Sequence, residues 1–413
     1  MWKPILDGEI QKEAIRIIKE VAEEVRDPKK EWATSEDATL AGGFSGLALF
    51  YAYLQGAFPE EGFESTAIEY LEKAVEISTS RQLYPGLYAG TSGVTWTIHH
   101  LGADESDEEG GDPLAKIDAA LLQYTGKTPW KDDYDVVSGL VGIGVYALEA
   151  LPKPRAKTLL EQIIMRLSEK AEEKEGGVAW KTEPELLPPW QRELAPKGYY
   201  NLGLAHGIPG IWAILAQAAA EGIQTDLATS LLEKSISWFL RQFIEKEESF
   251  PSWVVVEGTS DRGSRYAWCY GEPGIAISLF SSARFLGRSD WEEKALSIMR
   301  RVAKAPPERA GVKDAGICHG SAGLAHILNR FFQATEEELF RTAAEHWYKK
   351  TVEFQEPGKG IAGFRFMDEE KVEHSDPGLL TGSAGISLAL LSAAFPIEPL
   401  WDRFLLTSIP DSE

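Results

Sequence analysis

Cysteine is scarce in this chain, with only two among 413 residues. Two cysteines cannot form a disulfide framework, so a disulfide-stabilised secreted fold is excluded. Long apolar runs are also missing: stretches such as "GLALFYAYL" are about nine to twelve residues long, too short for the roughly 30 Å core of a bilayer. The first residues, "MWKPILDGEIQKEAIRIIKE", are charged and amphipathic, unlike a signal peptide. We therefore expect a cytoplasmic protein without a transmembrane segment.

Basic residues are outnumbered by acidic ones, with 42 Lys and Arg against 64 Asp and Glu, which gives a formal net charge of −22. Such a charge repels phosphate backbones and anionic membrane surfaces, so it argues against a nucleic-acid-binding function. The 44% hydrophobic and 26% charged residues indicate a globular chain that can bury a large core. The acidic run "ADESDEEGGD" at residues 103–112 is expected to be a solvated loop.

An internal repeat is the main pattern that the sequence does contain. The tetrad Gly-x-x-Gly, followed by an apolar run, begins at Gly43, Gly90, Gly139, Gly207, Gly271, Gly320 and Gly382. The residues after each tetrad are small or apolar on nearly every side, which is typical of a helix buried all round. Segments ahead of the tetrads, such as 10–25, 160–171 and 291–302, are amphipathic. Each repeat is therefore predicted to be an outer helix, a glycine loop and an inner helix.

Seven such helix pairs could form either an open solenoid or a closed ring. The first and last inner segments are as apolar as the middle ones, whereas the ends of an open array should carry polar faces. We therefore predict an all-α fold, a single α/α toroid domain over residues 1–413, with every glycine loop at one end. Three repeats carry extra segments, "GGVAWKTEP", "ESFPSWVVVEGT" and "GIAGFRFMDEEK", which are expected to form short hairpins or extended loops around a cleft at that end.

The repeat register indicates a metal site. Cys269 and Cys318 both lie two residues before the first glycine of a tetrad, and His206 and His319 lie one residue before. A toroid brings equivalent positions of adjacent repeats together. Two thiolates and one imidazole, from Cys269, Cys318 and His319, suit Zn²⁺ with its fourth position open, as in catalytic sites. The alternative, that both cysteines only fill gaps in the core, does not account for their shared register.

Further candidates lie near the same loops. His206 shares the register of His319, Asp135 lies four residues before its tetrad, and Arg265 lies four residues before Cys269. Taken singly, each of the two charged residues is more typical of a surface or an ion pair. The other five histidines lack this register and are assigned no chemistry: His99, His100, His326, His346 and His374.

Three segments, "AHGIPG", "RYAWCYGEPG" and "GICHGSAGL", together with the seven repeats, resemble the lanthionine synthetase C-like proteins, the lanthipeptide cyclases and their relatives. The resemblance covers essentially the whole chain and implies an α/α toroid with a zinc ion at one end. The zinc ligands that it implies are Cys269, Cys318 and His319. It implies His206 as the acid/base group, Asp135 as the active-site aspartate, and Arg265 and Tyr270 as neighbours of the metal.

The function implied by the resemblance is the addition of peptide cysteine thiols to dehydroalanine or dehydrobutyrine, forming thioether rings. Its substrate would be a dehydrated lanthipeptide precursor, with a dehydratase and an exporter as further partners. The residues suit this chemistry, because zinc deprotonates a thiol whose ordinary pKa is near 8.5. The imidazole of His206 is matched to protonation of the resulting enolate. Two thiolate ligands argue against a zinc hydrolase.

Three other interpretations remain open on the sequence alone. Relatives of the same superfamily add glutathione to dehydroamino acids, and their zinc ligands would not differ. A glycan-processing α/α toroid needs two opposed carboxylates, whereas Asp135 is the only acidic residue among the candidates in register. A non-catalytic scaffold stapled by zinc needs a fourth protein ligand, for which His206 is the obvious candidate.

Overall fold

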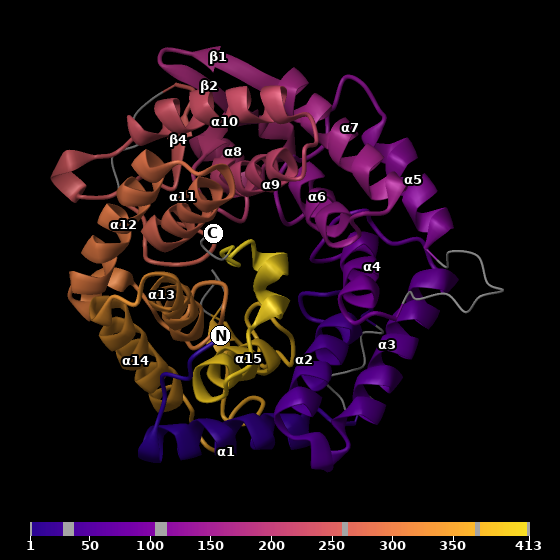
Figure 1. Ribbon diagram of the computed structural model, residues 1–413, viewed down its shortest axis with the longest axis vertical. Coiled ribbons are helices and arrows are strands. Elements are labelled where there is room, and N and C mark those ends of the chain that lie inside the picture. Colours follow the sequence, from indigo (N-terminus) through magenta and orange to yellow (C-terminus); the bar gives the residue numbers. More distant parts are fainter. Residues whose placement is uncertain (1, 28–36, 104–113, 258–262, 368–371, 411–413) are drawn as a thin grey trace.

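The computed structural model describes residues 2–27, 37–103, 114–257, 263–367 and 372–410, so most of the acidic run at 103–112 lies outside the described residues. Its helices form a closed ring of two layers (Figure 1). The inner layer consists of α2 (Phe44–Ala57), α4 (Thr91–His100), α6 (Leu140–Glu149), α9 (Ile208–Ala220), α11 (Glu272–Leu286), α13 (Ser321–Thr335) and α15 (Ser383–Ala394). The outer layer consists of α1 (Gly8–Glu24), α3 (Phe63–Ser80), α5 (Ala115–Thr125), α7 (Pro154–Lys170), α10 (Thr225–Leu240), α12 (Ser289–Lys304) and α14 (Glu338–Glu353). The predicted α/α toroid of seven helix pairs is confirmed.

The two layers differ in burial as their sequences predict. The inner helix α9 buries every residue except Gln217 and Ala220, because helices pack against it on all sides. The outer helix α12 buries one stripe, which contains Trp291, Ile298 and Met299, and turns its charged residues to solvent. Of the described residues, none of the helices has the length and apolar character that spanning a membrane requires.

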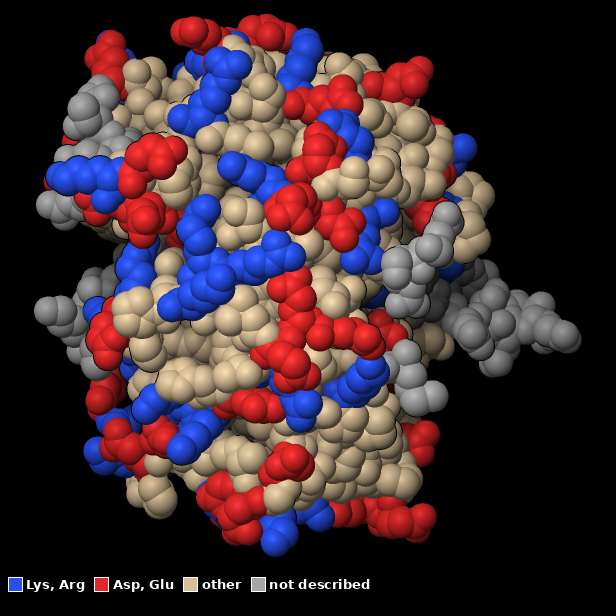
Figure 2. All heavy atoms as spheres, turned by 60° about the vertical axis from the view of Figure 1, so that its left-hand side comes forward, with Lys and Arg blue, Asp and Glu red and all other residues tan. Residues whose placement is uncertain are grey.

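Ion pairs join neighbouring outer helices. Figure 2 shows Lys and Arg side chains interspersed with Asp and Glu on the side of the ring that carries α12 and α14. Arg300 of α12 lies 2.7 Å from Glu337 at the start of α14, and Arg288 lies 2.6 Å from Glu233 of α10. Exposed pairs of this kind contribute about 0–1 kcal/mol each, so burial between the layers stabilises the ring much more than these contacts.

The glycine tetrads shape the loops at one end of the ring. The first glycine of each tetrad is the residue directly before an inner helix. A Cβ atom on the second glycine would lie only 1.8–2.8 Å from the carbonyl oxygen six residues earlier. Any larger residue would therefore push the loop away from the first turn of the helix. The repeated glycines are needed for this close packing.

A circle of backbone hydrogen bonds joins the seven loops. In each bond an N–H of one loop donates to a carbonyl oxygen of the adjacent loop, over 2.7–3.4 Å. The bonds run from Ala41 to Tyr88, Tyr88 to Val137, Val136 to Ala205, Ala205 to Cys269, Cys269 to Cys318, Cys318 to Leu380, and Leu379 to Ala41. All of these residues lie two positions before a tetrad, except Val136 and Leu379, which lie three positions before one. The loops therefore lie in register around the ring axis.

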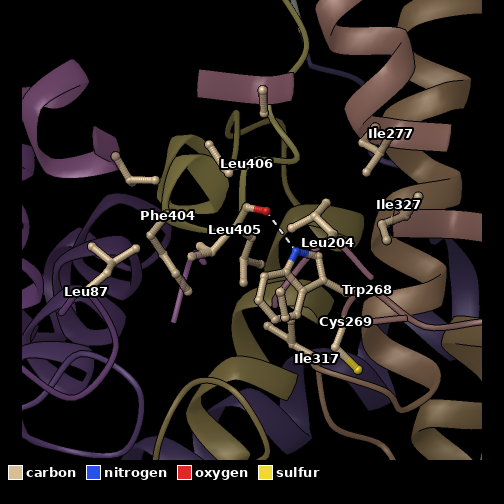
Figure 3. Close-up of a cluster of buried hydrophobic side chains, with 14 of the residues drawn as sticks. Leu87, Leu204, Trp268, Cys269, Ile277, Ile317, Ile327, Phe404, Leu405 and Leu406 are labelled. Atoms are coloured by element: carbon tan, nitrogen blue, oxygen red, sulfur yellow. Dashed lines mark hydrogen bonds between the residues drawn. The ribbon is translucent and has the colours of Figure 1, made fainter. Parts of the chain in front are cut away.

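The centre of the ring is filled by the segment that follows the last inner helix. The 3-10 helix Leu400–Leu405 lies inside the inner layer (Figure 1). Trp268 donates its indole N–H to the carbonyl oxygen of Leu405 over 2.8 Å, and the two residues lie among buried apolar side chains (Figure 3). The buried carboxylate of Asp402 binds Arg330 over 2.6 and 2.8 Å and His326 over 2.7 Å. The centre is packed core, and His326 is held in it by Asp402.

Strands occur in the three extra segments, but two of these segments join. Strands β1 (Ala171–Lys174), β2 (Gly177–Thr182), β3 (Tyr199–Asn201) and β4 (Trp253–Val255) form one antiparallel sheet in the order β1-β2-β3-β4. The first segment contributes β2, which forms a hairpin with the preceding strand β1, whereas the second contributes the edge strand β4 to the same sheet. The third segment contributes β5 (Phe366–Met367), which pairs with β6 (Glu373–His374). The short helix α8 (Pro189–Leu194) connects β2 to β3.

Candidate active site

A cavity of about 650 Å³ opens where the loops before α6, α9 and α11 meet the four-stranded sheet. Four residues predicted from the sequence line it: Asp135, His206, Arg265 and Tyr270. The first two extra segments also line the cavity, through residues such as Thr182 and Trp253. No described residue of the third segment lines this cavity, so the expected cleft is formed by two of the three segments.

Asp135 and His206 form a pair on two adjacent loops. Oδ2 of Asp135 lies 2.6 Å from Nδ1 of His206, and Oδ1 of Asp135 accepts a hydrogen bond from the backbone N–H of Ser138 over 2.7 Å. The surrounding loops partly desolvate His206, which lowers its pKa although the side chain is 44% exposed, but the hydrogen bond and charge of Asp135 outweigh this effect and raise the pKa above the ordinary value. Because Nδ1 is engaged by Asp135, Nε2 is the ring nitrogen left to exchange a proton with a substrate.

Cys269, Cys318 and His319 form a second cluster, in which the three ligand atoms lie within 4.8 Å of one another. The circle of backbone hydrogen bonds accounts for this, since the N–H of Cys269 donates to the carbonyl oxygen of Cys318 over 3.2 Å. Asp314 supports the histidine: its Oδ2 lies 3.4 Å from Nε2 of His319, while its Oδ1 accepts the N–H of Gly316 over 2.9 Å. A carboxylate behind a ligating histidine is common at metal sites.

The cluster fits a zinc ion. Zinc binds sulfur at about 2.3 Å and nitrogen at about 2.0–2.1 Å, so two ligand atoms of a tetrahedral site lie about 3.3–3.8 Å apart, a spacing that the upper bound of 4.8 Å in this cluster admits. The contact with Cys318 lowers the pKa of the Cys269 thiol well below its ordinary value. The contact with His319 also lowers this pKa, while burial raises it. Contact with Cys269 and burial raise the pKa of Cys318. One thiol of the pair is thus already disposed to lose its proton.

Arg265 and Tyr270 lie between the cluster and the cavity. Nη2 of Arg265 lies 3.9 Å from Sγ of Cys269, and the same side chain lines the cavity. The hydroxyl oxygen of Tyr270 accepts a hydrogen bond from the side-chain amide of Asn201 over 3.0 Å. Burial raises the pKa of Tyr270, so the phenol stays protonated and its O–H remains a donor.

The sequence analysis missed three polar residues of this region: Asp133, Asn201 and Asp314. Asp133 lines the cavity beside Asp135, and burial together with the charge of Asp135 raises its pKa to about 6. All three lie six residues before a tetrad, as Arg265 does, so the same register would have found them. At this position Oδ1 of four residues accepts the backbone N–H two residues ahead, over 2.7–2.9 Å: Asp37, Asn201, Asp314 and Asp376. The position therefore shapes the loops.

The sequence profile of the lanthionine synthetase C-like proteins matches residues 34–406. This chain belongs to the lanthionine synthetase C-like family. The nisin biosynthesis protein NisC of Lactococcus lactis subsp. lactis is 27% identical over 419 residues, covering 96% of this chain and 95% of NisC. The glutathione S-transferase LANCL1 of Danio rerio is 22% identical over 308 residues, covering 74% of this chain and 72% of LANCL1. The solved structure of nisin cyclase has the same fold, with a TM-score of 0.76 at 24% identity, covering 97% of this chain and 98% of that one.

The geometry bears on two of the alternative interpretations of this lanthionine synthetase C-like chain. His206 is not part of the ligand cluster found among the described residues, and its Nδ1 is bound to Asp135. A scaffold stapled by zinc would need a fourth protein ligand, and His206 does not lie where it could serve as that ligand. The cavity does contain a second carboxylate, Asp133, but it lies on the same loop as Asp135. The two carboxylates are not opposed across the cleft, as glycoside hydrolysis requires.

Proposed function

We propose that this protein is a zinc-dependent lanthipeptide cyclase. It adds a peptide cysteine thiol to dehydroalanine or dehydrobutyrine within the same peptide and forms a (methyl)lanthionine ring. The observation that carries this proposal is the position of the Asp135–His206 pair in a cavity that Arg265 connects to the cluster of Cys269, Cys318 and His319. The similarity to NisC over nearly the whole chain supports the same reaction.

The reaction needs no oxidant or reductant. The S–H bond of the cysteine and the carbon–carbon π bond break, a carbon–sulfur bond forms at the β-carbon, and a proton is added at the α-carbon, so no proton is gained or lost overall. Zinc held by the two cysteines and His319 would supply a Lewis acid that lowers the pKa of the substrate thiol. His206, oriented by Asp135, exchanges the proton through Nε2. Arg265 and the O–H of Tyr270 are positioned to stabilise negative charge on the enolate oxygen.

The test is incubation of the zinc-loaded protein with a dehydrated peptide that contains cysteine. The mass of the peptide should stay unchanged, because the addition is an isomerisation, while thiols that react with an alkylating reagent should disappear. The control is the same peptide with its dehydrated residues replaced by alanine, which should keep its thiols. If the first peptide also keeps its thiols when zinc is present, the cyclase proposal fails.

A second candidate is transfer of glutathione to a dehydroamino acid, and the similarity to LANCL1 over 74% of the chain favours it specifically. The two functions separate on a dehydrated peptide without cysteine, offered together with glutathione. A transferase increases the mass of this peptide by that of glutathione, whereas a cyclase leaves the peptide unmodified. Thiol loss in the cysteine-containing peptide without any glutathione adduct would select the cyclase.

The proposed function includes a place in the cell and further partners. Both cysteines are free, which agrees with a reducing cytoplasm, where lanthipeptide precursors would be modified before export. The substrate is the dehydrated precursor peptide, so a dehydratase must act first, and an exporter must act afterwards. We place the dehydratase and the exporter as partners of this chain.

A further inference from the structure

Part of the cavity lining is an apolar wall. The wall consists of Leu186, Leu187, Pro188, Trp190 and Trp253. Its residues come from the connection between β2 and β3, including α8, and from the edge strand β4. The proton-transfer pair Asp135–His206 and this wall line the same 650 Å³ cavity, so a substrate that reaches the pair lies against the wall.

The wall exposes apolar surface that a folded chain would otherwise bury. The side chain of Trp190 is 44% exposed, although it has neighbours such as Trp253, whose ring centroid lies 6.4 Å away. Eight large hydrophobic side chains are exposed in the described part of the chain, and among them Trp190 lines this cavity. Exposed apolar surface inside a cavity is typical of a binding site.

The wall is also held rigidly. Arg192 of α8 donates hydrogen bonds to three backbone carbonyl oxygens of the preceding turn, those of Pro184, Glu185 and Leu187, over 2.7, 3.3 and 3.0 Å. The ring of Trp253 stacks on Tyr199, with centroids 5.4 Å apart and planes 14° apart. Tyr199 in turn donates its hydroxyl hydrogen bond to Gln191 over 2.7 Å. A surface fixed in this way loses little conformational entropy when it binds a ligand.

We propose that the apolar wall binds an apolar side chain next to the reacting cysteine of the substrate peptide. This inference rests on the proposed function for the identity of the substrate. The ligand is a peptide because the cavity has the volume for several side chains and is lined both by apolar residues and by hydrogen-bonding groups such as Asn201 and His206. The wall selects which cysteine approaches His206: a cysteine flanked by Leu, Ile or Phe is held there, and one flanked by serine is not.

The test compares two variants of α8. Trp190→Ala removes the exposed centre of the wall, and Leu194→Ala is the matched control, because Leu194 lies on the same helix, is 63% exposed and does not line the cavity. The probes are two unreactive peptides, in which alanine replaces the cysteine and the dehydrated residue. One carries leucine and the other serine on both sides of the former cysteine. Dissociation constants are measured by calorimetry.

The leucine peptide should bind wild type more tightly than the serine peptide. Trp190→Ala should weaken binding of the leucine peptide about tenfold, because an apolar side chain loses most of its cover, and should change the serine peptide less than about twofold. Leu194→Ala should change neither. Equal weakening of both peptides by Trp190→Ala, or equal effects of the two variants, overturns the proposal. If Trp190→Ala does not fold, as judged by circular dichroism, Trp190→Gln is used in its place.

The binding test is independent of the chemistry, because the probes cannot react. Suppose that wild type prefers the leucine peptide, that the preference disappears in Trp190→Ala, and that no peptide is ever cyclised. The proposal that the wall binds an apolar side chain is then supported, and the cyclase function is refuted. If peptides are cyclised but wild type binds the leucine and serine probes equally, the cyclase function stands and the apolar wall is overturned.

Discussion

Replacement of Asp135 by asparagine tests how the Asp135–His206 pair works. In the structure Oδ2 of Asp135 faces Nδ1 of His206 at 2.6 Å, while Oδ1 accepts the N–H of Ser138. Asparagine has the same shape, and its carbonyl oxygen can keep the bond to Ser138. Its NH₂ group then faces Nδ1, which must act as an acceptor. The neutral imidazole therefore carries its proton on Nε2, the opposite of the tautomer that the carboxylate favours.

The expected loss of rate is roughly 10²- to 10⁴-fold, because both the tautomer and the charge that holds the imidazolium are lost. The pH dependence should change as well. Desolvation lowers the pKa of His206, while the hydrogen bond and charge of Asp135 are the largest contributions that raise it, with the net shift upward. Without this carboxylate the largest raising contributions are lost, so the inflection of the rate profile due to His206 should move to lower pH. This direction holds whether His206 acts as the base or as the acid.

Stability should follow the same linkage. Because the pKa of His206 is raised in the folded state, its favourable contribution is fully present below the unfolded-state pKa of about 6.5 and is lost as pH rises through the folded-state pKa. The difference in unfolding free energy between wild type and Asp135→Asn should therefore be larger at about pH 5 than at about pH 9. Denaturant unfolding at the two pH values measures it.

The matched control is Asp133→Asn, which removes a carboxylate from the same loop and cavity without touching the hydrogen bond to His206. Single-turnover loss of peptide thiol, followed from about pH 5 to pH 9, should show less than a tenfold loss of rate in this control. If both variants lose rate equally, Asp135 acts only as one more negative charge, and the orientation of His206 by Asp135 is refuted.

Three further predictions concern the metal, the proton transfer and the packed centre. Purified protein should contain about one zinc per chain, and Cys318→Ala should lose much of it, since only two protein ligands remain; full occupancy by metal analysis would contradict the ligand assignment. His206→Asn should retain zinc and slow thiol loss by roughly 10²- to 10⁴-fold, whereas zinc loss would make His206 a ligand. Asp402→Asn should destabilise the protein by about 3–5 kcal/mol in denaturant unfolding, because it removes the buried carboxylate that pairs with the guanidinium of Arg330 and leaves only the carbonyl oxygen of Pro399 and the more distant Glu398 in contact with that charge. Asp290→Asn, at an exposed pair, should cost about 0–1 kcal/mol, and equal losses would show that burial of the Asp402 pair is irrelevant.

The repeat register could predict the ligand cluster because a ring converts sequence spacing into position. Cys269 and Cys318 are far apart in the chain, yet each lies two residues before a tetrad, and the loops align these positions through backbone hydrogen bonds. Amphipathic spacing likewise identified the buried stripe of α12. Both features repeat along the chain, so both leave a periodic signal.

Features that occur once could not be predicted in the same way. The pairing of β3 with β4 joins two three-residue strands that α9 and α10 separate in the chain, so neither strand leaves a strong local signal. The raised pKa of Asp133 depends on burial by neighbours from several loops. The sequence of the 3-10 helix Leu400–Leu405 has no periodic pattern that places it in the ring. Its contacts from Asp402 to His326 and Arg330 are therefore known only from the structure. The roles proposed for the site residues remain predictions until the variants are measured.

The circle of backbone hydrogen bonds gives the loop end of the molecule an approximate sevenfold symmetry axis. Positions two residues before the tetrads are geometrically equivalent around this axis, and Cys269 and Cys318 occupy two adjacent ones. The frame itself does not distinguish this pair from any other. A chain carrying Ala205→Cys and Tyr270→His would place the same ligand types one repeat earlier, with Cys269 shared between the old cluster and the new one. The frame thus presents the same backbone position seven times, and the side chains at these positions determine where a set of metal ligands can come together.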